Sequence, residues 1–235
     1  MKRLFQRIHE KAENVAAPPV LIAAFGDSVT QGVMEHRMLD GQGVFHRLLQ
    51  TKLENFYPTT TFSTLNAGVS GDSAVRALDR LDRDVIRHDP DLVLVAFGLN
   101  DSLDGRKALP QFDSAIRQIV LRVRQQTEAD LILVTPPFMA RCKGHRIHVE
   151  HEAMAERIIQ TQNEGILGLY AEAIRKIAMD SAIGLADVHA EWQRLSATGL
   201  DTDTWLINGL NHPDARGHHL AGELIFQVIL QGRES

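Results

Sequence analysis

Five short apolar runs recur along the chain, and longer, more polar stretches separate them. The runs show no clean alternation of apolar and polar positions, which is the pattern of strands that are covered on both faces. They cover residues 20–25, 60–66, 91–97, 131–135 and 183–188. Strands that alternate with helices predict an α/β protein with one parallel sheet and right-handed crossovers.

The intervening stretches carry apolar residues at the spacing of amphipathic helices. They cover about 42–56, 74–88, 111–128, 151–180 and 214–231. A further short amphipathic helix lies in the first 19 residues; we expect it to pack on the domain, with membrane-surface association as the alternative. Because no linker, repeat or low-complexity tract interrupts the pattern, we predict one domain over residues 1–235, with residues 1–19 as an N-terminal helical extension.

Composition narrows the possible partners. The chain has 235 residues and a formal net charge of −5, which gives no electrostatic argument for binding nucleic acid or an anionic membrane. No run approaches the roughly 20 apolar residues of a membrane span, and the basic start lacks the apolar core of a signal peptide. A single cysteine, Cys142, cannot form an internal disulfide, so we expect a reducing, cytoplasmic location.

Glycine and polar residues follow the first three predicted strands directly. These segments are 26–28 (Gly-Asp-Ser), 66–72 (Asn-Ala-Gly-Val-Ser-Gly-Asp) and 98–101 (Gly-Leu-Asn-Asp). Ligands of open α/β sheets bind outside the carboxyl ends of the strands, so these segments are expected to border the site. Ser28 is the candidate nucleophile, and a serine hydroxyl needs a base to take its proton. His212, in the late segment Asn-His-Pro, is the best candidate for that base.

In their order along the chain, these segments resemble the four blocks of the SGNH, or GDSL-type, hydrolases. The resemblance implies the flavodoxin-like three-layer α/β/α arrangement with a five-stranded parallel sheet. It also implies that Ser28 is the nucleophile and His212 the base. Gly71 and Asn100 match the family's oxyanion-hole positions, with the backbone amide of Ser28 as the third donor. Such donors stabilise the negative charge that develops on the carbonyl oxygen in acyl transfer.

One position departs from the family pattern. The family usually has an aspartate three residues before the histidine, where this chain has Gly209, and the residue four before is Asn208. An asparagine carbonyl can accept the Nδ1 proton and orient the ring, although it lacks the full charge of a carboxylate. We therefore expect Asn208 to orient His212. Asp201 or Asp203, or a dyad supported by backbone carbonyls, are the alternatives.

Two other residues invite a catalytic interpretation. Ser73 lies in a second Gly-Asp-Ser triplet, but it opens a predicted helix, where a serine is an ordinary cap. The resemblance implies that Asp27 holds the nucleophile loop by hydrogen bonds, without proton transfer. No Gly-x-Ser-x-Gly elbow occurs, which argues against the α/β-hydrolase family.

The longest irregular segment, about 136–150, follows the fourth strand and is expected to border the site. Three histidines lie in or beside it: His145, His148 and His151. We interpret them mainly as a solvated loop, with substrate contact or metal binding as alternatives, because no zinc-enzyme motif accompanies them. No phosphate-binding glycine fingerprint follows the first strand, which argues against a flavodoxin-like nucleotide-binding protein. We expect no cofactor and no metal.

These features predict a serine esterase that hydrolyses a carboxylic ester through an acyl-enzyme. The expected partner is a small-molecule ester such as an acetylated carbohydrate, because no long apolar loop indicates a lipid-binding lid. The departure at Asn208 leaves a catalytically impaired module that binds a glycan or acyl ligand as one alternative. A lipid esterase or thioesterase is another.

Overall fold

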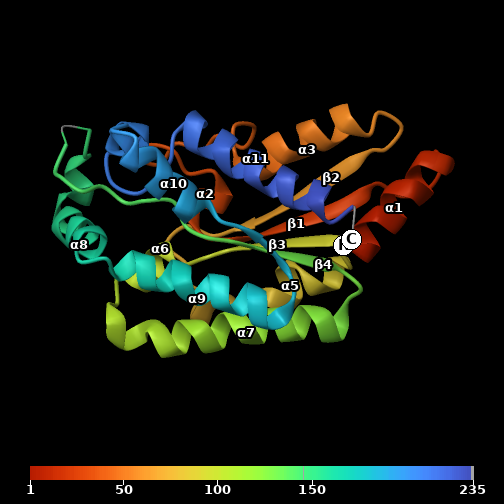
Figure 1. Ribbon diagram of the computed structural model, residues 1–235, viewed down its shortest axis with the longest axis horizontal. Coiled ribbons are helices and arrows are strands. Elements are labelled where there is room, and N and C mark those ends of the chain that lie inside the picture. Colours follow the sequence, from red (N-terminus) through yellow and green to blue (C-terminus); the bar gives the residue numbers. More distant parts are fainter. Residues whose placement is uncertain (145, 234–235) are drawn as a thin grey trace.

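The computed structural model describes residues 1–144 and 146–233. Its centre is a sheet of five parallel strands, which are β1 (Val20–Gly26), β2 (Phe62–Gly68), β3 (Leu92–Ala96), β4 (Asp130–Val134) and β5 (Gly184–Ala186). Their order across the sheet is β2-β1-β3-β4-β5. Figure 1 labels the first four strands in this order. The predicted five-stranded parallel sheet of flavodoxin-like type is confirmed, with every strand end within two residues of its expected position.

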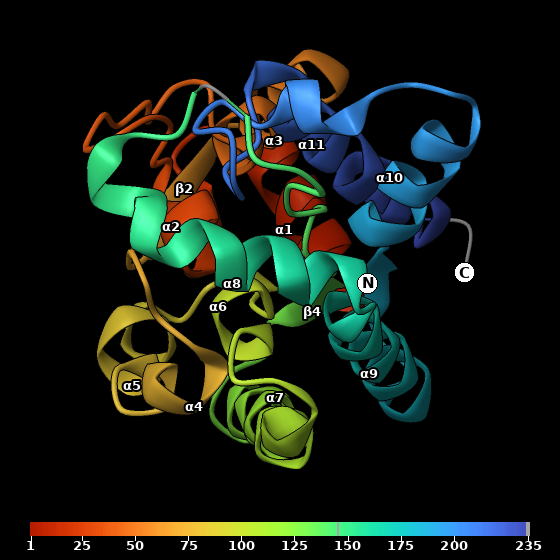
Figure 2. The same ribbon diagram turned by 90° about the vertical axis from the view of Figure 1, so that its left-hand side faces the viewer.

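Helices cover both faces of the sheet and complete the three layers (Figures 1 and 2). One face is covered by α1 (Lys2–Glu13), α3 (Phe45–Phe56), α10 (Val188–Ala197) and α11 (Ala215–Gln231). The other is covered by α4 (Ala74–Ala77), α5 (Leu81–Asp84), α7 (Leu109–Gln126) and α9 (Ile166–Ser181). Successive strand residues serve opposite cores: Ile22 packs with the first set of helices, and Ala23 with the second. Full burial of each Ile, Leu or Val contributes about 1.5–3 kcal/mol.

Two predicted helices are interrupted. The stretch 151–180 divides into α8 (Glu152–Asn163) and α9 at Gly165, whose φ of 68° is cheap for glycine and costly for other residues. The stretch 74–88 divides into α4, α5 and a 3₁₀ turn, η1 (Ile86–His88). Helix α10 is absent from the predicted elements, although Asp187 caps it by accepting from the Ala190 amide at 3.1 Å.

The N-terminal helix α1 packs on the domain as expected. Leu4 is fully buried, and its backbone amide donates to the Asp130 carboxylate at 2.8 Å. Arg3 and Arg7 both pair with the buried Asp91, which precedes β3. Helix α1 is therefore fixed to the amino ends of β3 and β4. In the described residues, no helix is both long and apolar enough to cross a membrane.

Two glycines at strand ends bring the nucleophile segment close to the sheet. A Cβ on Gly68, at the end of β2, would lie 2.2 Å from the backbone nitrogen of Gln31 in the short helix α2 (Ser28–Gln31). A Cβ on Gly26 would lie 2.6 Å from the Ala96 carbonyl oxygen. Without side chains at these positions, α2 lies directly against the carboxyl ends of β1 and β2.

Candidate active site

Ser28 is the first residue of α2, immediately beyond β1. The Asp27 carboxylate caps this helix by accepting from the Val29 amide at 3.0 Å. Gly32 ends it in the left-handed conformation, with φ of 90°. The serine is largely enclosed, with an exposed fraction of 5%. The turn that carries the Ser28 hydroxyl is therefore short, capped by Asp27 and bounded by Gly26 and Gly32.

His212 lies in the loop between the 3₁₀ helix η4 (Thr202–Trp205) and α11, 184 positions after Ser28. Its Nε2 is 3.0 Å from the Ser28 Oγ. This is the separation that proton transfer to a general base requires. The structure therefore brings together the two residues predicted as nucleophile and base.

The other ring nitrogen faces a backbone carbonyl. His212 Nδ1 lies 3.0 Å from the Met34 carbonyl oxygen, in the segment that follows α2. A carbonyl only accepts, so Nδ1 carries the proton in the neutral ring. Nε2 is then unprotonated and able to accept the Ser28 hydroxyl proton. Met34 therefore orients the ring and fixes its tautomer.

The expectation that Asn208 orients the ring is corrected by these contacts. Its side-chain carbonyl accepts instead from the backbone amides of Leu210, Asn211 and His212, at 2.9–3.0 Å. Its amide group donates to the Asn211 side chain at 3.1 Å. The carbonyl is thus occupied by the loop's own amides. Asn208 holds the backbone that carries His212 and does not contact the ring's Nδ1.

The two aspartates offered as alternatives are engaged elsewhere. Asp203 accepts from both the backbone amide and the guanidinium of Arg141, at 2.8 and 3.0 Å. Asp201 lies 3.3 Å from the same guanidinium. Within residues 1–144 and 146–233, the partner of His212 Nδ1 is thus a carbonyl and not a carboxylate. This arrangement is the backbone-supported dyad among the alternatives.

The predicted oxyanion-hole residues follow the two strands that flank β1. Gly71 lies beyond β2 with φ of 73°, and Asn100 lies in α6 (Leu99–Ser102), beyond β3. The Asn100 amide donates one hydrogen to the Asp72 carbonyl at 2.9 Å, and an amide nitrogen carries a second. Arg80 ties the strand ends together by donating to the carbonyls of Gly26 and Ala67. The sheet order therefore places Ser28 between both predicted donors.

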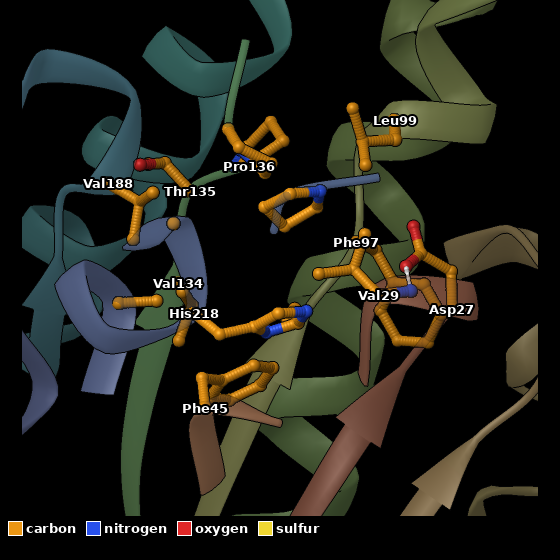
Figure 3. A pocket seen from close by; sticks show the side chains of 15 residues that line it. Asp27, Val29, Phe45, Phe97, Leu99, Val134, Thr135, Pro136, Val188 and His218 are labelled. Atoms are coloured by element: carbon orange, nitrogen blue, oxygen red, sulfur yellow. Dashed lines mark hydrogen bonds between the residues drawn. The ribbon is translucent and has the colours of Figure 1, made fainter. Parts of the chain in front are cut away.

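Two hollows adjoin these residues. Gly71 and Asn100 line an open cleft of about 420 Å³, whose walls are both charged and apolar and include Ser73, Arg76, Asp104, Gln111, Met154 and Arg157. A smaller cavity of about 30 Å³ lies beside the nucleophile turn, with Asp27 and His218 on different walls (Figure 3). That cavity is mainly apolar and has room for about two water-sized groups.

Burial sets the electrostatics of the site. Desolvation is the main cause that raises the pKa of Asp27 to about 7 and that of Asp101 to about 6, and nearby carboxylates add to it. Desolvation also lowers the pKa of His212 below 6.5, against the opposing effect of the Met34 carbonyl. The neutral, proton-accepting form of His212 is thereby favoured near neutral pH.

Sequence patterns missed two residues of this site. Met34 acts through its backbone carbonyl, for which no side-chain signal exists. Arg80 was visible only as a charge within a predicted helix, although it reaches the ends of β1 and β2. Ser73 caps α4, as predicted, by accepting from the Arg76 amide. His145, one of the three loop histidines, lies outside the described residues.

Comparison with known proteins places this geometry in a family. Residues 24–220 match the GDSL-like Lipase/Acylhydrolase family. The chain belongs to this family. It is therefore a carboxylic ester hydrolase. The family match also supports a serine nucleophile and an oxyanion hole. No curated protein sequence gave a significant match.

Solved structures share the fold at low sequence identity. A lipase/acylhydrolase from Enterococcus faecalis is 20% identical, with a TM-score of 0.69 over 91% of this chain and 96% of the other. An acetylxylan esterase from Geobacillus stearothermophilus is also 20% identical, with a TM-score of 0.68 over 89% and 93%. Catalytic mutants of that esterase replace a serine, an aspartate and a histidine, and the aspartate lies three residues before the histidine. This chain has Gly209 at the corresponding spacing from His212.

Proposed function

We propose that this enzyme is a serine esterase that uses Ser28 and His212 as a dyad to hydrolyse a short-chain acyl ester. The observation that carries the proposal is the 3.0 Å contact between Ser28 Oγ and His212 Nε2, combined with the Met34 carbonyl at Nδ1. A hydroxyl, an imidazole and an acceptor behind the imidazole are the components of nucleophilic acyl transfer.

In this mechanism Ser28 Oγ attacks the ester carbonyl while His212 Nε2 takes the hydroxyl proton. Negative charge develops on the carbonyl oxygen, where the amides of Ser28 and Gly71 and the Asn100 side chain donate to it. His212 then protonates the leaving alcohol, and an acyl group remains on Ser28. Water, deprotonated by His212, hydrolyses this acyl-enzyme and restores the hydroxyl.

An acetyl ester on a carbohydrate is the proposed substrate class. The cavity of about 30 Å³ is lined by Asp27 and Val29, the neighbours of Ser28, although not by Ser28 itself, and it has room only for a short acyl group. The walls of the larger cleft beside Gly71 and Asn100 are partly apolar, and their charged and polar side chains suit a hydroxyl-rich leaving group. The structural neighbour that is an acetylxylan esterase supports the same class.

Because a carbonyl replaces the carboxylate behind His212, a catalytically impaired glycan- or acyl-binding module is the second candidate. A short-chain aryl ester assay and a serine-directed phosphonate separate the two. We expect turnover and covalent labelling at Ser28, both abolished in Ser28→Ala and both retained in the matched Ser73→Ala variant. Ligand binding without turnover or labelling would favour the module. Loss of activity in Ser73→Ala alone would overturn the nucleophile assignment.

A further inference from the structure

Histidines from two distant segments meet near the active site. His36 follows the turn after α2. His148 directly precedes, and His151 ends, the 3₁₀ turn η3 (Val149–His151), beyond the long loop after β4. The His36 and His148 rings are stacked, with centroids 3.8 Å apart. His36 Nδ1 lies 3.3 Å from His151 Nε2. We name His36, His148, Glu150 and His151 the histidine cluster.

A carboxylate completes the set of donors. Glu150 Oε2 lies 3.6 Å from His36 Nε2, and one donor atom from each of His36, His148 and Glu150 falls within 4.8 Å of the others. Arg37 also contacts Glu150, at 3.1 Å, so the carboxylate is shared with a cation on the exposed side. The cluster therefore combines imidazole nitrogens with one carboxylate.

We propose that the histidine cluster binds one divalent transition-metal ion of the Zn²⁺ type. Imidazole and carboxylate groups are ordinary Zn²⁺ ligands, with metal–nitrogen distances of about 2.0–2.1 Å. Two nitrogens on a tetrahedral ion are then about 3.3–3.4 Å apart, which is the separation of His36 Nδ1 and His151 Nε2. Glu150 faces the other ring nitrogen of His36, Nε2, and the His148 ring is stacked on the His36 ring, so these two side chains must change rotamer to bind an ion held at Nδ1. Both side chains are at least partly exposed.

The protonation state of His36 suits this role. Desolvation and the neighbouring His148, Arg37 and His151 lower the pKa of His36, with Glu150 opposing them. A neutral imidazole is the form that binds a metal. The distances, and not this shift, define the site.

The proposed metal site lies close to the segment that orients the catalytic histidine. His36 is two residues beyond Met34, whose carbonyl orients His212. An ion shared between His36 and the residues around η3 ties the Met34 segment to the loop after β4. It thereby restrains the carbonyl that fixes the tautomer of the base.

Isothermal titration of the chelator-treated, tag-free protein with ZnCl₂ tests the binding. We expect one ion per chain, and an affinity reduced by about tenfold or more in His36→Ala and in His151→Ala. The matched control is His219→Ala, an exposed histidine on α11, which is expected to bind like the parent protein. An absence of saturable binding, or equal binding by parent and His36→Ala, overturns the proposal.

Thermal unfolding provides a second readout that needs no catalysis. At about 100 times the Kd, Zn²⁺ is expected to raise Tm by about 5 °C or more, and this shift should vanish in His36→Ala. Zn²⁺ should also change kcat more than KM in the parent protein but not in His36→Ala. Tight binding with unchanged kcat would refute the link to Met34. Binding without any esterase activity would count against the proposed function and leave the metal site standing.

Discussion

At the residue scale, the feature that sets the chemistry is the carbonyl behind His212. A carbonyl dipole orients the imidazole and fixes its proton on Nδ1, as a carboxylate does. It stabilises the imidazolium formed during attack less than a full negative charge would. Burial adds to this effect, because it lowers the pKa of His212. His212 is therefore a weaker base than a histidine supported by a carboxylate, and it stays neutral over a wide pH range.

The pH profile of kcat/KM tests this description. A group with a lowered pKa loses its proton at lower pH, so we expect activity to rise through one ionisation whose midpoint lies below 6.5. In His151→Ala the midpoint should move upward, because His151 is one of the groups that lower the pKa of His212. A parent midpoint above 6.5 would mean that a carboxylate acts on His212 in solution.

At the element scale, the loop between η4 and α11 depends on one side chain. Asn208 is buried, and its carbonyl accepts three consecutive backbone amides, including that of His212. Buried amides without an acceptor cost about 1–3 kcal/mol each when they remain dry. The loop is therefore organised from within and delivers His212 to Ser28.

Two substitutions of Asn208 test whether its side chain positions the loop that carries His212. We expect Asn208→Ala to lower the free energy of unfolding by about 1–3 kcal/mol, because the Leu210 amide stays buried whereas the amides of Asn211 and His212 are partly exposed to water. We also expect it to lower kcat by about tenfold or more, because the base is displaced. Asn208→Asp should retain most of both, since a carboxylate still accepts the three amides. Denaturant unfolding and steady-state kinetics measure these effects. Parent-like values in both variants would show that the loop holds its shape without this residue.

The segment after β4 determines which acyl groups fit. Phe138 is buried in the core beside α10 and α11, Met139 is fully buried in a smaller apolar cluster with Leu99 and Leu210, and the cavity beside the nucleophile turn is small. We therefore expect kcat/KM to fall steadily as the acyl chain of an aryl ester grows from acetyl to octanoyl. A maximum at long chains would indicate that this segment opens to a lipid and that a lipid esterase or thioesterase is the better description.

At the scale of the whole molecule, the sheet is predictable because each strand is a local signal. A strand that is buried on both faces can be recognised from its continuous apolar run alone. The glycine-rich segments that follow these runs indicate the edge of the sheet at which the active site lies. Helix interruptions at Gly165 and around Leu78–Arg80 are less visible, because the apolar periodicity continues across them. Contacts that join distant segments, such as Met34 to His212 and His36 to His151, carry no local pattern at all.

The pH dependence of folding stability is also a property of the whole fold, because buried histidines and buried aspartates contribute to it in opposite directions. His46, His189 and His218 are buried, and desolvation lowers their pKa values to about 4. The unfolded chain therefore binds more protons below pH 6.5, so stability is lost as pH falls toward 4. Asp27 and Asp101, with raised pKa values, act in the opposite direction.

A substitution of Asp27 tests the contribution of a buried carboxyl group to this pH dependence. Its pKa rises from 3.8 to about 7, so the folded state binds more protons than the unfolded state between these values. Its contribution is therefore fully present below pH 3.8 and is lost as pH rises through about 7. Asp27→Asn keeps an acceptor for the Val29 amide but removes the charge, so we expect its Tm to gain on the parent's as pH rises from 5 to 8. Asp79→Asn, at an exposed position, is the control and should follow the parent. A constant difference in Tm between Asp27→Asn and the parent across this range would show that Asp27 is ionised in the folded protein throughout, and that burial does not hold its proton.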